Sequence, residues 1–525
     1  MIIRSPHPPV PLSGLRLTEF ILANAAEAGD KAAIIDGTDG RAISYRDLAT
    51  AIASAAAGLA RHGVRRGDVI ALASPTCPEF AIAFHAALLA GAAVTPVSPL
   101  APAAELTRQL THSGARWMIT TAAVLEEYGR MAAAAAGLGP DSIFGFGDAP
   151  GALPFGSLLG DCPAAPADSA ASSDDLAYLP YSSGTTGLPK GVMLSHRSLV
   201  ANLCQIRSVH QVRGNDVLLA ALPWFHIFGL QTCLNLGLRE GATIVTMPRF
   251  EPREFLRLVQ HYQVTRVTVV PPIVLALARH PEVGEYDISS LRLITSGAAP
   301  LGAELARACA RRLGCKVSQA YGMTEFGMSH TMPDDAEDKL DFVGLPLPGI
   351  ECRVVDPVTG ADVPSGAAGE LLVRGPANMR GYLNNREATA ATLDADGFVH
   401  TGDMVVVDDA GRFRVVSRLK ELIKYKGHQV APAALEAILL RHPAVADAAV
   451  IGSPDDEAGE LPMAFVVARE PVRAGDLMAF VARQVAPHEK IRRLEFTDEI
   501  PRSPAGKILR QVLAARQPAA AGILP

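Results

Sequence analysis

Lysine is scarce in this sequence: only nine of its 525 residues are lysines, although lysine and arginine together number 48. The remaining cationic residues are therefore arginines, and this bias, together with many Ala, Gly and Pro residues, indicates a GC-rich genome. Where composition favours Arg, each remaining Lys is a stronger candidate for a position that needs an ammonium group on a flexible stem. The nine are Lys31, Lys190, Lys316, Lys339, Lys420, Lys424, Lys426, Lys490 and Lys507.

The sequence also has none of the marks of a secreted or membrane-spanning protein. Its first residues, MIIRSPHPPVPLSG, include no apolar stretch of the kind that a signal peptide needs. The apolar run from Ala81 to Val97 contains His85, Gly91 and Pro96 and is shorter than the roughly 20 residues of a membrane span. The seven cysteines form no C-x-x-C pair and are interpreted as buried residues in a reducing compartment. We expect a cytoplasmic protein with no membrane partner.

An excess of positive charge is missing as well. The 48 Lys and Arg residues are outnumbered by 54 Asp and Glu, which gives a formal net charge of −6. A general nucleic-acid binder carries a basic surface, so this balance argues against a nucleic-acid partner. Apolar residues make up 49% of the chain and charged residues 19%, as in folded proteins. The length predicts more than one domain.

Strand and helix patterns alternate over most of the chain, which predicts an α/β fold with parallel sheets covered by helices. The clearest strand-containing segments are 65–99, 115–121, 216–223, 242–247 and 264–272. From Gly349 to Gly411, short strands separated by Gly, Asp and Pro predict antiparallel structure. The polar segment 161–175 reads as a loop or linker. We predict an N-terminal domain over residues 1–417 and a small α+β C-terminal domain over residues 418–525.

The segment YSSGTTGLPKGVMLSH, residues 181–196, carries the strongest chemical signal. Glycines let a backbone approach a phosphate closely and turn its N–H groups inward, hydroxyls donate to phosphate oxygens, and a Lys adds positive charge. The spacing differs from that of a P-loop, because Lys190 follows Pro189 and no Ser or Thr comes next. The segment therefore predicts a phosphate-binding loop of another kind.

Further motifs follow in order: PWFHIFGL (223–230), TSGAAPL (295–301), QAYGMTE (319–325), HTGD (400–403), SRLKELIKYKGHQVAP (417–432) and PRSPAGKILR (501–510). With these, nearly the whole chain resembles the adenylate-forming enzymes, and in particular acyl-CoA synthetases of the 4-coumarate–CoA ligase type. The resemblance implies a large N-terminal domain with several subdomains, built of parallel α/β sheets and a β-barrel-like part. It also implies that the C-terminal domain is mobile.

The resemblance implies a two-step reaction. A carboxylate attacks the α-phosphate of ATP, which gives an acyl-adenylate and pyrophosphate, and the thiol of CoA then displaces AMP. A carboxylate is a poor acylating agent at neutral pH, so a better leaving group is installed first, and catalysis rests on positioning and charge neutralisation. The implied substrates and cofactors are ATP, Mg²⁺, CoA and a carboxylic acid. A homodimer is left open as the oligomeric state, and the compositional bias favours bacterial secondary metabolism.

The family's motifs assign roles to named residues. The phosphate-binding candidates are Ser182, Ser183, Gly184, Thr185, Thr186, Gly187 and Lys190. Glu325 would hold Mg²⁺, Thr324 would contact the α-phosphate, and Tyr321 would stack on adenine. Asp403, assisted by Arg418, would accept hydrogen bonds from the ribose hydroxyls. The other candidates for binding ATP or AMP are Gly297, Ala298, Ala299, Gln319, Gly322 and Gln429.

The remaining candidates concern the acyl group and the C-terminal domain. His226 resembles the family's His at the carboxylate entrance, and Lys507 resembles the Lys that neutralises charge during adenylation. Trp224, Phe225, Phe228 and Ala320 are acyl-pocket candidates, although the three aromatic residues are equally compatible with a core position. Lys420 corresponds to the hinge about which the small domain rotates. Lys424, Lys426 and Gly427 would serve the CoA step.

Two positions depart from the usual wording of the family. Ala320 stands where Gly is usual before Tyr321, so its methyl group would narrow the pocket or forbid a left-handed φ. Ser417 replaces a more usual Asp beside Arg418. One alternative is therefore an enzyme that mainly thioesterifies a supplied acyl-adenylate. The others are an enzyme that loads a carrier protein, a luciferase-like oxygenase and a non-catalytic nucleotide-binding homologue. The identity of the acid is not predicted.

Overall fold

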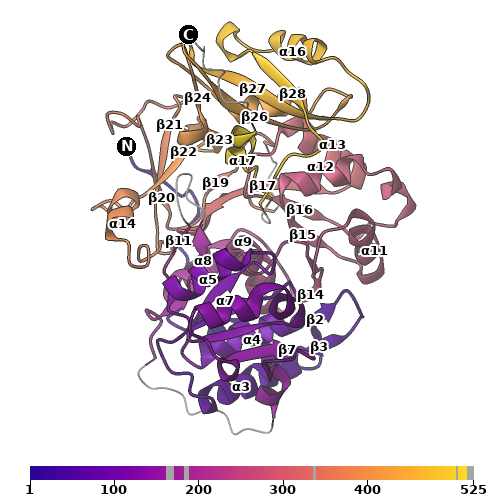
Figure 1. Cartoon of the computed structure of the whole chain (residues 1–525), viewed down its shortest axis with the longest axis vertical. Helices are drawn as coiled ribbons and strands as arrows, with labels where there is room; N and C mark the ends of the chain where they lie inside the picture. Colours follow the sequence, from indigo (N-terminus) through magenta and orange to yellow (C-terminus); the bar gives the residue numbers. More distant parts are fainter. Residues whose placement is uncertain (161–170, 183–188, 335–338, 504–505, 517–525) are drawn as a thin grey trace.

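The computed structural model describes residues 1–160, 171–182, 189–334, 339–503 and 506–516. Figure 1 shows the N-terminal sheets and their helices at one end of the molecule and the C-terminal part, in yellow, at the other. An antiparallel sheet, in orange, and helices α12 (Pro271–Arg279) and α13 (Ala303–Leu313) lie between them. The candidate site is built where these parts meet.

A mostly parallel sheet forms the N-terminal end. Its seven described strands are, in spatial order, β12 (Leu194–Ser195), β9 (Leu176–Tyr178), β5 (Ala93–Val97), β4 (Val69–Ala73), β6 (Trp117–Thr121), β7 (Ile143–Phe146) and β8 (Leu153–Pro154). The pair of β12 and β9 is antiparallel, and the other pairs are parallel. The strand–helix–strand reading of segment 65–99 is thus confirmed.

A second sheet carries the site at its edge. Its nine described strands are, in spatial order, β19 (Leu345–Pro346), β18 (Gly327–Thr331), β17 (Lys316–Met323), β16 (Leu293–Ser296), β15 (Arg266–Val269), β13 (Val217–Ala220), β14 (Thr243–Thr246), β2 (Ala32–Asp36) and β3 (Ala42–Ser44). The strands from β17 to β2 are parallel, and the edge strands are antiparallel.

Helices cover both sheets. The longer ones are α3 (Tyr45–Arg61), α4 (Pro78–Leu89), α5 (Ala103–Ser113), α8 (His196–Arg207) and α11 (Pro252–Tyr262). Helix α3 begins where the Ser44 hydroxyl accepts the backbone N–H of Asp47, a usual N-cap. Helix α4 is apolar all round and almost entirely buried, as expected of a helix in the centre of a large core.

The segment 349–411 belongs to an antiparallel sheet, as predicted. Its described strands are β1 (Ile3–Arg4), β20 (Glu351–Val355), β21 (Gly369–Arg374), β22 (Val399–Val407) and β23 (Phe413–Arg418). Helix α14 (Arg386–Thr392) lies between β21 and β22 in the chain. This sheet is the part that the sequence predicts to be barrel-like. It ends in Arg418, which places that residue at the border with the C-terminal part.

The chain enters a separate sheet through a single 3-10 turn, Leu419–Glu421. The strands of this sheet are β25 (His428–Val430), β24 (Ile423–Tyr425), β27 (Gly459–Ala468), β26 (Val445–Asp455) and β28 (Arg493–Phe496). The helices of this part are α15 (Pro432–Leu439), α16 (Ala474–Ala482) and α17 (Arg510–Ala515). Both the hairpin at 423–430 and the following helix are as predicted, which confirms the small α+β part.

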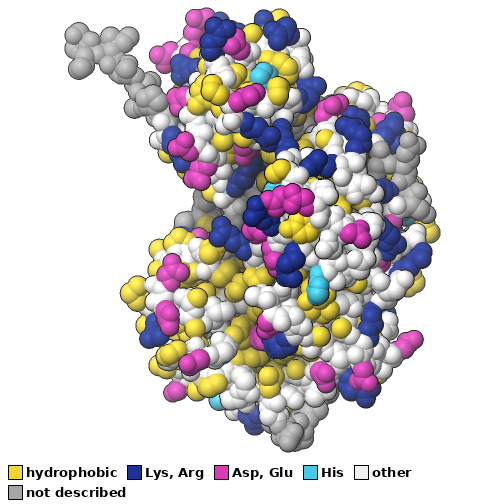
Figure 2. Space-filling model, turned by 90° about the vertical axis from the view of Figure 1, so that its right-hand side faces the viewer, with side chains coloured by type: hydrophobic (Ala, Val, Ile, Leu, Met, Phe, Trp, Pro, Cys, Tyr) yellow, Lys and Arg dark blue, Asp and Glu magenta, His cyan; other side chains and the backbone are white. Residues whose placement is uncertain are grey.

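Charged side chains of both signs are mixed on the surface. Figure 2 shows Lys and Arg side chains interspersed with Asp and Glu over the face in view, rather than gathered into a basic area. In the described part of the chain, no helix combines the length and apolar character that crossing a bilayer requires.

Candidate active site

The candidate site lies at the carboxyl edge of the parallel strands in the nine-stranded sheet. Because β13, β15, β16 and β17 run in one direction, the segments that follow them meet at this edge. These segments carry His226 after β13, Val270 after β15, Gly297 after β16 and Tyr321 at the end of β17. Ligands of open α/β sheets bind outside such strand ends. The topology therefore assembles motifs that lie far apart in the sequence.

The two ends of the glycine-rich segment are paired with each other. Ser182, in β10 (Tyr181–Ser182), lies opposite Lys190, in β11 (Lys190–Gly191). The phosphate-binding candidates Ser183, Gly184, Thr185, Thr186 and Gly187 lie outside the described residues. The described residues on either side of these candidates are therefore neighbours in an antiparallel pair.

Glu325 is a buried carboxylate beside this pair. Its side chain is only 4% exposed, and its Oε1 accepts the hydroxyl of Ser182 at 3.1 Å and that of Tyr382 at 2.9 Å. The Nζ of Lys190 lies 4.4 Å from the ring centroid of Tyr382, within reach of a cation–π contact. Thr324, next to Glu325, lies half-buried in the turn between β17 and β18.

Tyr382 is a site residue that sequence reasoning did not select. It lies in the segment GYLNN, which carries no motif of its own. Burial raises the pKa of its hydroxyl, and the charge of Glu325 raises it further. The hydroxyl therefore stays protonated and able to donate. Tyr382 thus contacts both the ammonium group of Lys190 and the carboxylate of Glu325.

The carboxylate of Glu325 fits a Mg²⁺ ion that is bound mainly by phosphate oxygens. Mg²⁺ keeps several waters and takes one or two protein carboxylates together with substrate phosphates. In the described part of the chain, no group of three or more His, Cys, Asp or Glu side chains forms a metal site of its own. The carboxylate of Glu325, next to Ser182, would suit such an ion, which would neutralise phosphate charge.

Asp403 holds a second buried carboxylate, which is 3% exposed. Its Oδ2 accepts the hydroxyl of Tyr321 at 2.7 Å, and its Oδ1 pairs with Nε of Arg418 at 2.9 Å. The register of β22 and β23 places Asp403 opposite Arg418. Burial raises the pKa of Tyr321, and Asp403 raises it further. A carboxylate has about four lone-pair sites, so Asp403 keeps capacity for ribose hydroxyls.

Ser417, which stands where the family usually has Asp, is buried next to Arg418. It pairs with Met404 across the sheet, and its hydroxyl donates to the carbonyl of Arg418 at 3.3 Å. Burial opposes the charge of Arg418, yet the carboxylate of Asp403 raises the pKa of Arg418. The ion pair of Arg418 with Asp403 is therefore complete without an acid at position 417.

Gly297 explains how the apolar side of the site packs. A Cβ at this position would lie 2.7 Å from Cζ of Phe228 and 3.2 Å from the carbonyl oxygen of Ala320. Only glycine therefore lets the Phe228 ring and the backbone of Ala320 come so close. Ala298, the next residue, has a φ of 68°. Ala320 itself lies in β17 and has no left-handed φ. Its methyl group is therefore compatible with the backbone conformation at this position.

Gly322 and Gln319 support this side of the site. A Cβ at Gly322 would lie 2.1 Å from the carbonyl oxygen of Gly327, so the turn after β17 requires glycine there. The amide oxygen of Gln319 accepts the N–H of Leu301 at 3.2 Å, and its Nε2 donates to the carbonyl of Leu301 at 3.2 Å and to that of Leu340. Because both ends of the amide are bonded to backbone, the structure assigns Gln319 a supporting position. The predicted contact of Gln319 with the nucleotide stays a prediction.

His226 lies after β13 and caps the short helix α9 (Ile227–Gly229). Its Nδ1 accepts the N–H of Phe228 at 3.4 Å. Burial lowers the pKa of His226 to about 4, so the ring is neutral at pH 7 and carries its proton on Nε2. The resemblance implies that His226 moves between the two half-reactions. A neutral imidazole that accepts one long hydrogen bond, from the N–H of Phe228, is suited to such a movement.

The aromatic acyl-pocket candidates separate into two groups. Trp224 is 0% exposed, and its ring centroid lies 6.0 Å from that of Phe80 in the core. Its assignment to the acyl pocket is corrected, because a fully enclosed side chain presents no surface to a ligand. Phe225 and Phe228 are only half-buried, as is Ala299 on the neighbouring loop, and they keep access to the site.

Lys507 reaches the site from the C-terminal part. Its loop is closed by the bond from the N–H of Ser503 to the carbonyl of Lys507 at 2.8 Å. Gly506, with a φ of 78°, comes so close to Val270 that a Cβ there would lie 2.9 Å from Cγ2 of that residue. Burial lowers the pKa of Lys507, and the charge of Arg418 lowers it further. Lys507 is half-buried, and its loop contacts the N-terminal part at Val270.

The lysines of the KYKG hairpin differ from Lys507. Lys424 on β24 and Gln429 on β25 are exposed and lie opposite each other, and Lys426 is exposed in the turn between these strands. Lys426, with a φ of 46°, pairs through Nζ with Glu457 at 2.6 Å, and Gly427 follows with a φ of 80°. Lys420 lies in the 3-10 turn that joins the two parts. The roles predicted for these residues stay predictions.

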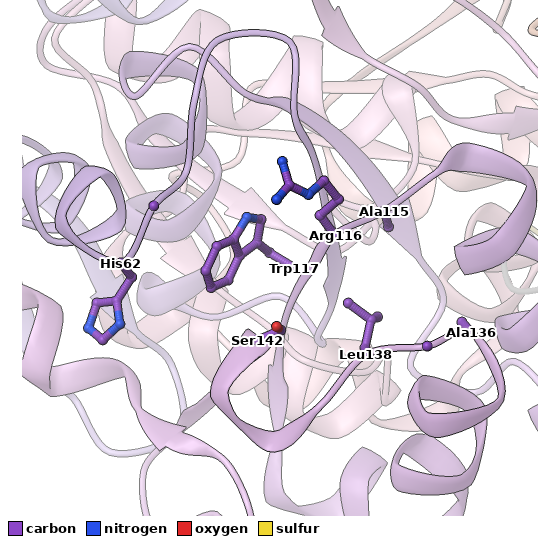
Figure 3. A pocket seen from close by; sticks show the side chains of 9 residues that line it. His62, Ala115, Arg116, Trp117, Ala136, Leu138 and Ser142 are labelled. Atoms are coloured by element: carbon purple, nitrogen blue, oxygen red, sulfur yellow. The ribbon is translucent and has the colours of Figure 1, made fainter.

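A separate cavity of about 520 Å³ opens on the N-terminal end. Figure 3 shows His62, Arg116, Trp117, Leu138 and Ser142 around it. These residues lie at the ends of α3, β6 and neighbouring turns, and they include none of the predicted site residues. The candidate active site is therefore elsewhere, at the carboxyl edge of the nine-stranded sheet.

The buried carboxylates of Glu325 and Asp403 lie at the edge of the sheet where the motif-bearing segments meet, and comparisons with known proteins identify the family. The sequence pattern of the AMP-binding enzyme family matches residues 21–383, and that of the family's C-terminal domain matches residues 434–507. The chain belongs to the AMP-binding enzyme family, and it is an adenylate-forming acyl-CoA synthetase, an AMP-forming acid–thiol ligase.

Similar proteins agree over the full length. The chain is 41% identical to 4-coumarate–CoA ligase 3 of Oryza sativa subsp. japonica, over 100% of this chain and 96% of that protein. ATP-bound MatB from Rhodopseudomonas palustris is similar with a TM-score of 0.87 and 29% identity, covering 95% of this chain and 99% of that one. The anthranilate CoA ligase AuaEII in complex with anthranoyl-AMP has a TM-score of 0.88 and 26% identity, covering 96% and 98%.

Proposed function

We propose that this acyl-CoA synthetase activates an aryl carboxylic acid, with an aryl propenoic acid as the first candidate. The similarity to 4-coumarate–CoA ligases supports the propenoic acid, and the relative that binds anthranoyl-AMP supports an aromatic acid more broadly. Half-buried Phe225 and Phe228 support the same class, because aromatic rings pack favourably against an aromatic acyl group.

In the first half-reaction, the acid's carboxylate oxygen bonds to the α-phosphorus of ATP and the bond to pyrophosphate breaks. We propose that Lys190 and the glycine-rich loop hold the β- and γ-phosphates, and that Asp403 holds the ribose. The ammonium group of Lys507 then neutralises charge that develops between carboxylate and α-phosphate. The close approach of the Lys507 loop, at Gly506, to Val270 at the sheet edge that carries the site is the observation that supports this assignment.

In the second half-reaction, the sulfur of CoA bonds to the acyl carbon and AMP leaves with the bonding electrons. Lys507 has no part in that step, so its loop can withdraw. We propose that the domain turns at Lys420 and that the hairpin with Lys424, Lys426 and Gly427 replaces it. Gln429 is proposed to face the nucleotide during adenylation. His226, neutral in the resting site, is proposed to move between the two steps.

The cellular setting is proposed on the composition alone. Few lysines, the negative net charge and seven cysteines without a C-x-x-C pair favour a cytoplasmic enzyme of bacterial secondary metabolism that has no nucleic-acid partner. A homodimer is the assembly to test by sedimentation.

A panel of acids tests the proposed function. Pyrophosphate release and acyl-CoA formation are measured separately with aryl propenoates, benzoates, fatty acids and dicarboxylates, and a synthetic acyl-adenylate serves as control. We expect both products with aryl propenoates. Preference for a fatty or dicarboxylic acid would contradict the substrate class. Acyl-CoA from the supplied adenylate alone, without pyrophosphate release from any acid, would show a specialist for the second half-reaction.

A further inference from the structure

Helix α12 contacts the C-terminal part at both of its ends. At its N-terminus, Val270 packs against Gly506 in the Lys507 loop. At its C-terminus, the guanidinium of Arg279 donates to the carbonyl of Leu440 at 2.6 Å and to those of Val445 and Ala446 at 3.0 Å each. Leu440 ends helix α15, whose last carbonyls lack partners within the helix. Arg279 thus binds acceptors that a helix end leaves open.

A continuous chain of contacts joins Arg279 to Lys507. The carbonyl of Ala446 that Arg279 binds is followed directly by Asp447. Both carboxylate oxygens of Asp447 accept from Nη2 of Arg502, at 2.9 and 3.1 Å. Nη1 of Arg502 donates to the carbonyl of Gly506 at 3.1 Å, one residue before Lys507. The start of β26, which Arg279 binds at Val445 and Ala446, is therefore also linked through Arg502 to the loop that carries Lys507.

We propose that Arg279 is a positioning residue that keeps the C-terminal domain in the orientation in which Lys507 reaches the adenylation site. The inference rests on the proposed two-step function. Three bonds from one guanidinium fix an orientation better than one contact does, because the planar donor groups have a set geometry. For the CoA step the same bonds must break, so Arg279 favours the first half-reaction over the second.

The first test compares the two half-reactions in Arg279→Ala. Acid-dependent ATP–pyrophosphate exchange is expected to fall about tenfold, since hydrogen bonds from a charged group are lost. Conversion of supplied acyl-adenylate to acyl-CoA is expected to stay the same or rise. Arg279→Lys, which keeps the charge but not the three-bond geometry, should lie between wild type and Arg279→Ala. Equal losses in both steps would overturn the proposal, because they would show a general structural role.

Arg312→Ala is the matched control. The guanidinium of Arg312 also binds backbone carbonyls, those of His280 at 2.7 Å and Pro281 at 3.2 Å, directly after the end of α12. All three residues belong to the N-terminal part, so no interdomain bond is lost. We expect Arg312→Ala to leave the ratio of the two half-reactions unchanged. A shift in that ratio as large as that of Arg279→Ala would also overturn the proposal.

A disulfide reporter tests the orientation without any acid. A Cβ at Gly302, before α13, would lie 3.6 Å from Cβ of Ala437 in α15, within the roughly 3.5–4.5 Å of disulfides. The pair Gly302→Cys and Ala437→Cys should therefore cross-link under mild oxidation, and adding Arg279→Ala should slow this about tenfold. An unchanged rate would overturn the positioning role.

The reporter also separates this inference from the proposed function. If cross-linking slows but no acid in the panel releases pyrophosphate, the positioning role stands and the proposed acid activation fails. If pyrophosphate exchange is normal in Arg279→Ala while cross-linking slows, the positioning role is overturned and the proposed function stands.

Discussion

The two charged groups that the site brings to ATP are held in different ways. Asp403 is buried between Tyr321 and Arg418, all on strands of the N-terminal part. Lys507 comes from another sheet system and depends on the contacts of Gly506 with Val270 and of Arg279 with the C-terminal domain. In the proposed domain movement, the first group would stay in place and the second would leave the site with its domain. Substitutions in the two regions should therefore affect different steps.

The largest effect is expected from Lys507→Ala. Because preorganised charge is lost where charge develops, ATP–pyrophosphate exchange should fall by at least about 100-fold. Conversion of a supplied acyl-adenylate should keep most of its rate, since Lys507 has no part in thioester formation. Both are measured on the same enzyme preparation. Normal exchange in Lys507→Ala would show that Lys507 does not act in adenylation. The proposed difference between Lys507, which serves one step, and Asp403, which serves both, would then be wrong.

Asp403→Asn should instead slow both half-reactions, each by about tenfold. The amide has nearly the size of the carboxylate but gives up the ion pair with Arg418 and one strong acceptor for ribose, and charge-assisted hydrogen bonds are about twice as strong as neutral ones. The loss should be seen as a higher KM for ATP and for supplied acyl-adenylate. A loss confined to one step would show that Asp403, like Lys507, serves a single arrangement.

A smaller, pH-dependent effect sharpens the comparison. Burial and the neighbouring Arg418 lower the pKa of Lys507, and adenylation needs its protonated form. As pH rises through this lowered pKa, the charge is lost, so exchange should decline at a lower pH than a free Lys would allow. Arg stays protonated, so Lys507→Arg should abolish this alkaline decline at a reduced rate. A decline that persists in Lys507→Arg would assign it to another group.

The smallest effect is expected from Ala320→Gly. Ala320 lies in extended β17, opposite Thr331, so glycine is not needed for its backbone. Only a methyl group is removed, and pyrophosphate exchange should change by less than about fourfold with aryl acids, because burying one such group is worth about 0.8 kcal/mol. A large rise in exchange would show that this methyl group limits adenylation.

Sequence motifs predicted much of the site because the chemistry of phosphate and Mg²⁺ demands recognisable residue types. Lys190, Glu325, Asp403 and Lys507 were found in this way. Tyr382 was not, because its pairing with Glu325 and Lys190 depends on how β11 meets the segment after β21.

Other features that the sequence did not reveal have a similar cause. The amide of Gln319 is bonded to the backbone of Leu301, a contact that the sequence motif does not indicate. Trp224 belongs to the core, where an aromatic residue in an apolar motif is equally at home. Arg279 is the last residue of α12, and the sequence does not show that its guanidinium binds the carbonyl of Leu440 at the end of α15. Side chains that serve long-range packing carry no local signal in the sequence.

The central claim is that the docked arrangement serves adenylation and that thioester formation needs a different one. The cross-linked Gly302→Cys, Ala437→Cys enzyme tests it directly, with pyrophosphate release and acyl-CoA formation measured before and after reduction. We predict that the oxidised enzyme forms acyl-adenylate and pyrophosphate in a single turnover but no acyl-CoA, and that reduction restores the thioester. Acyl-CoA formation by the oxidised enzyme at the rate of the reduced one would contradict the account.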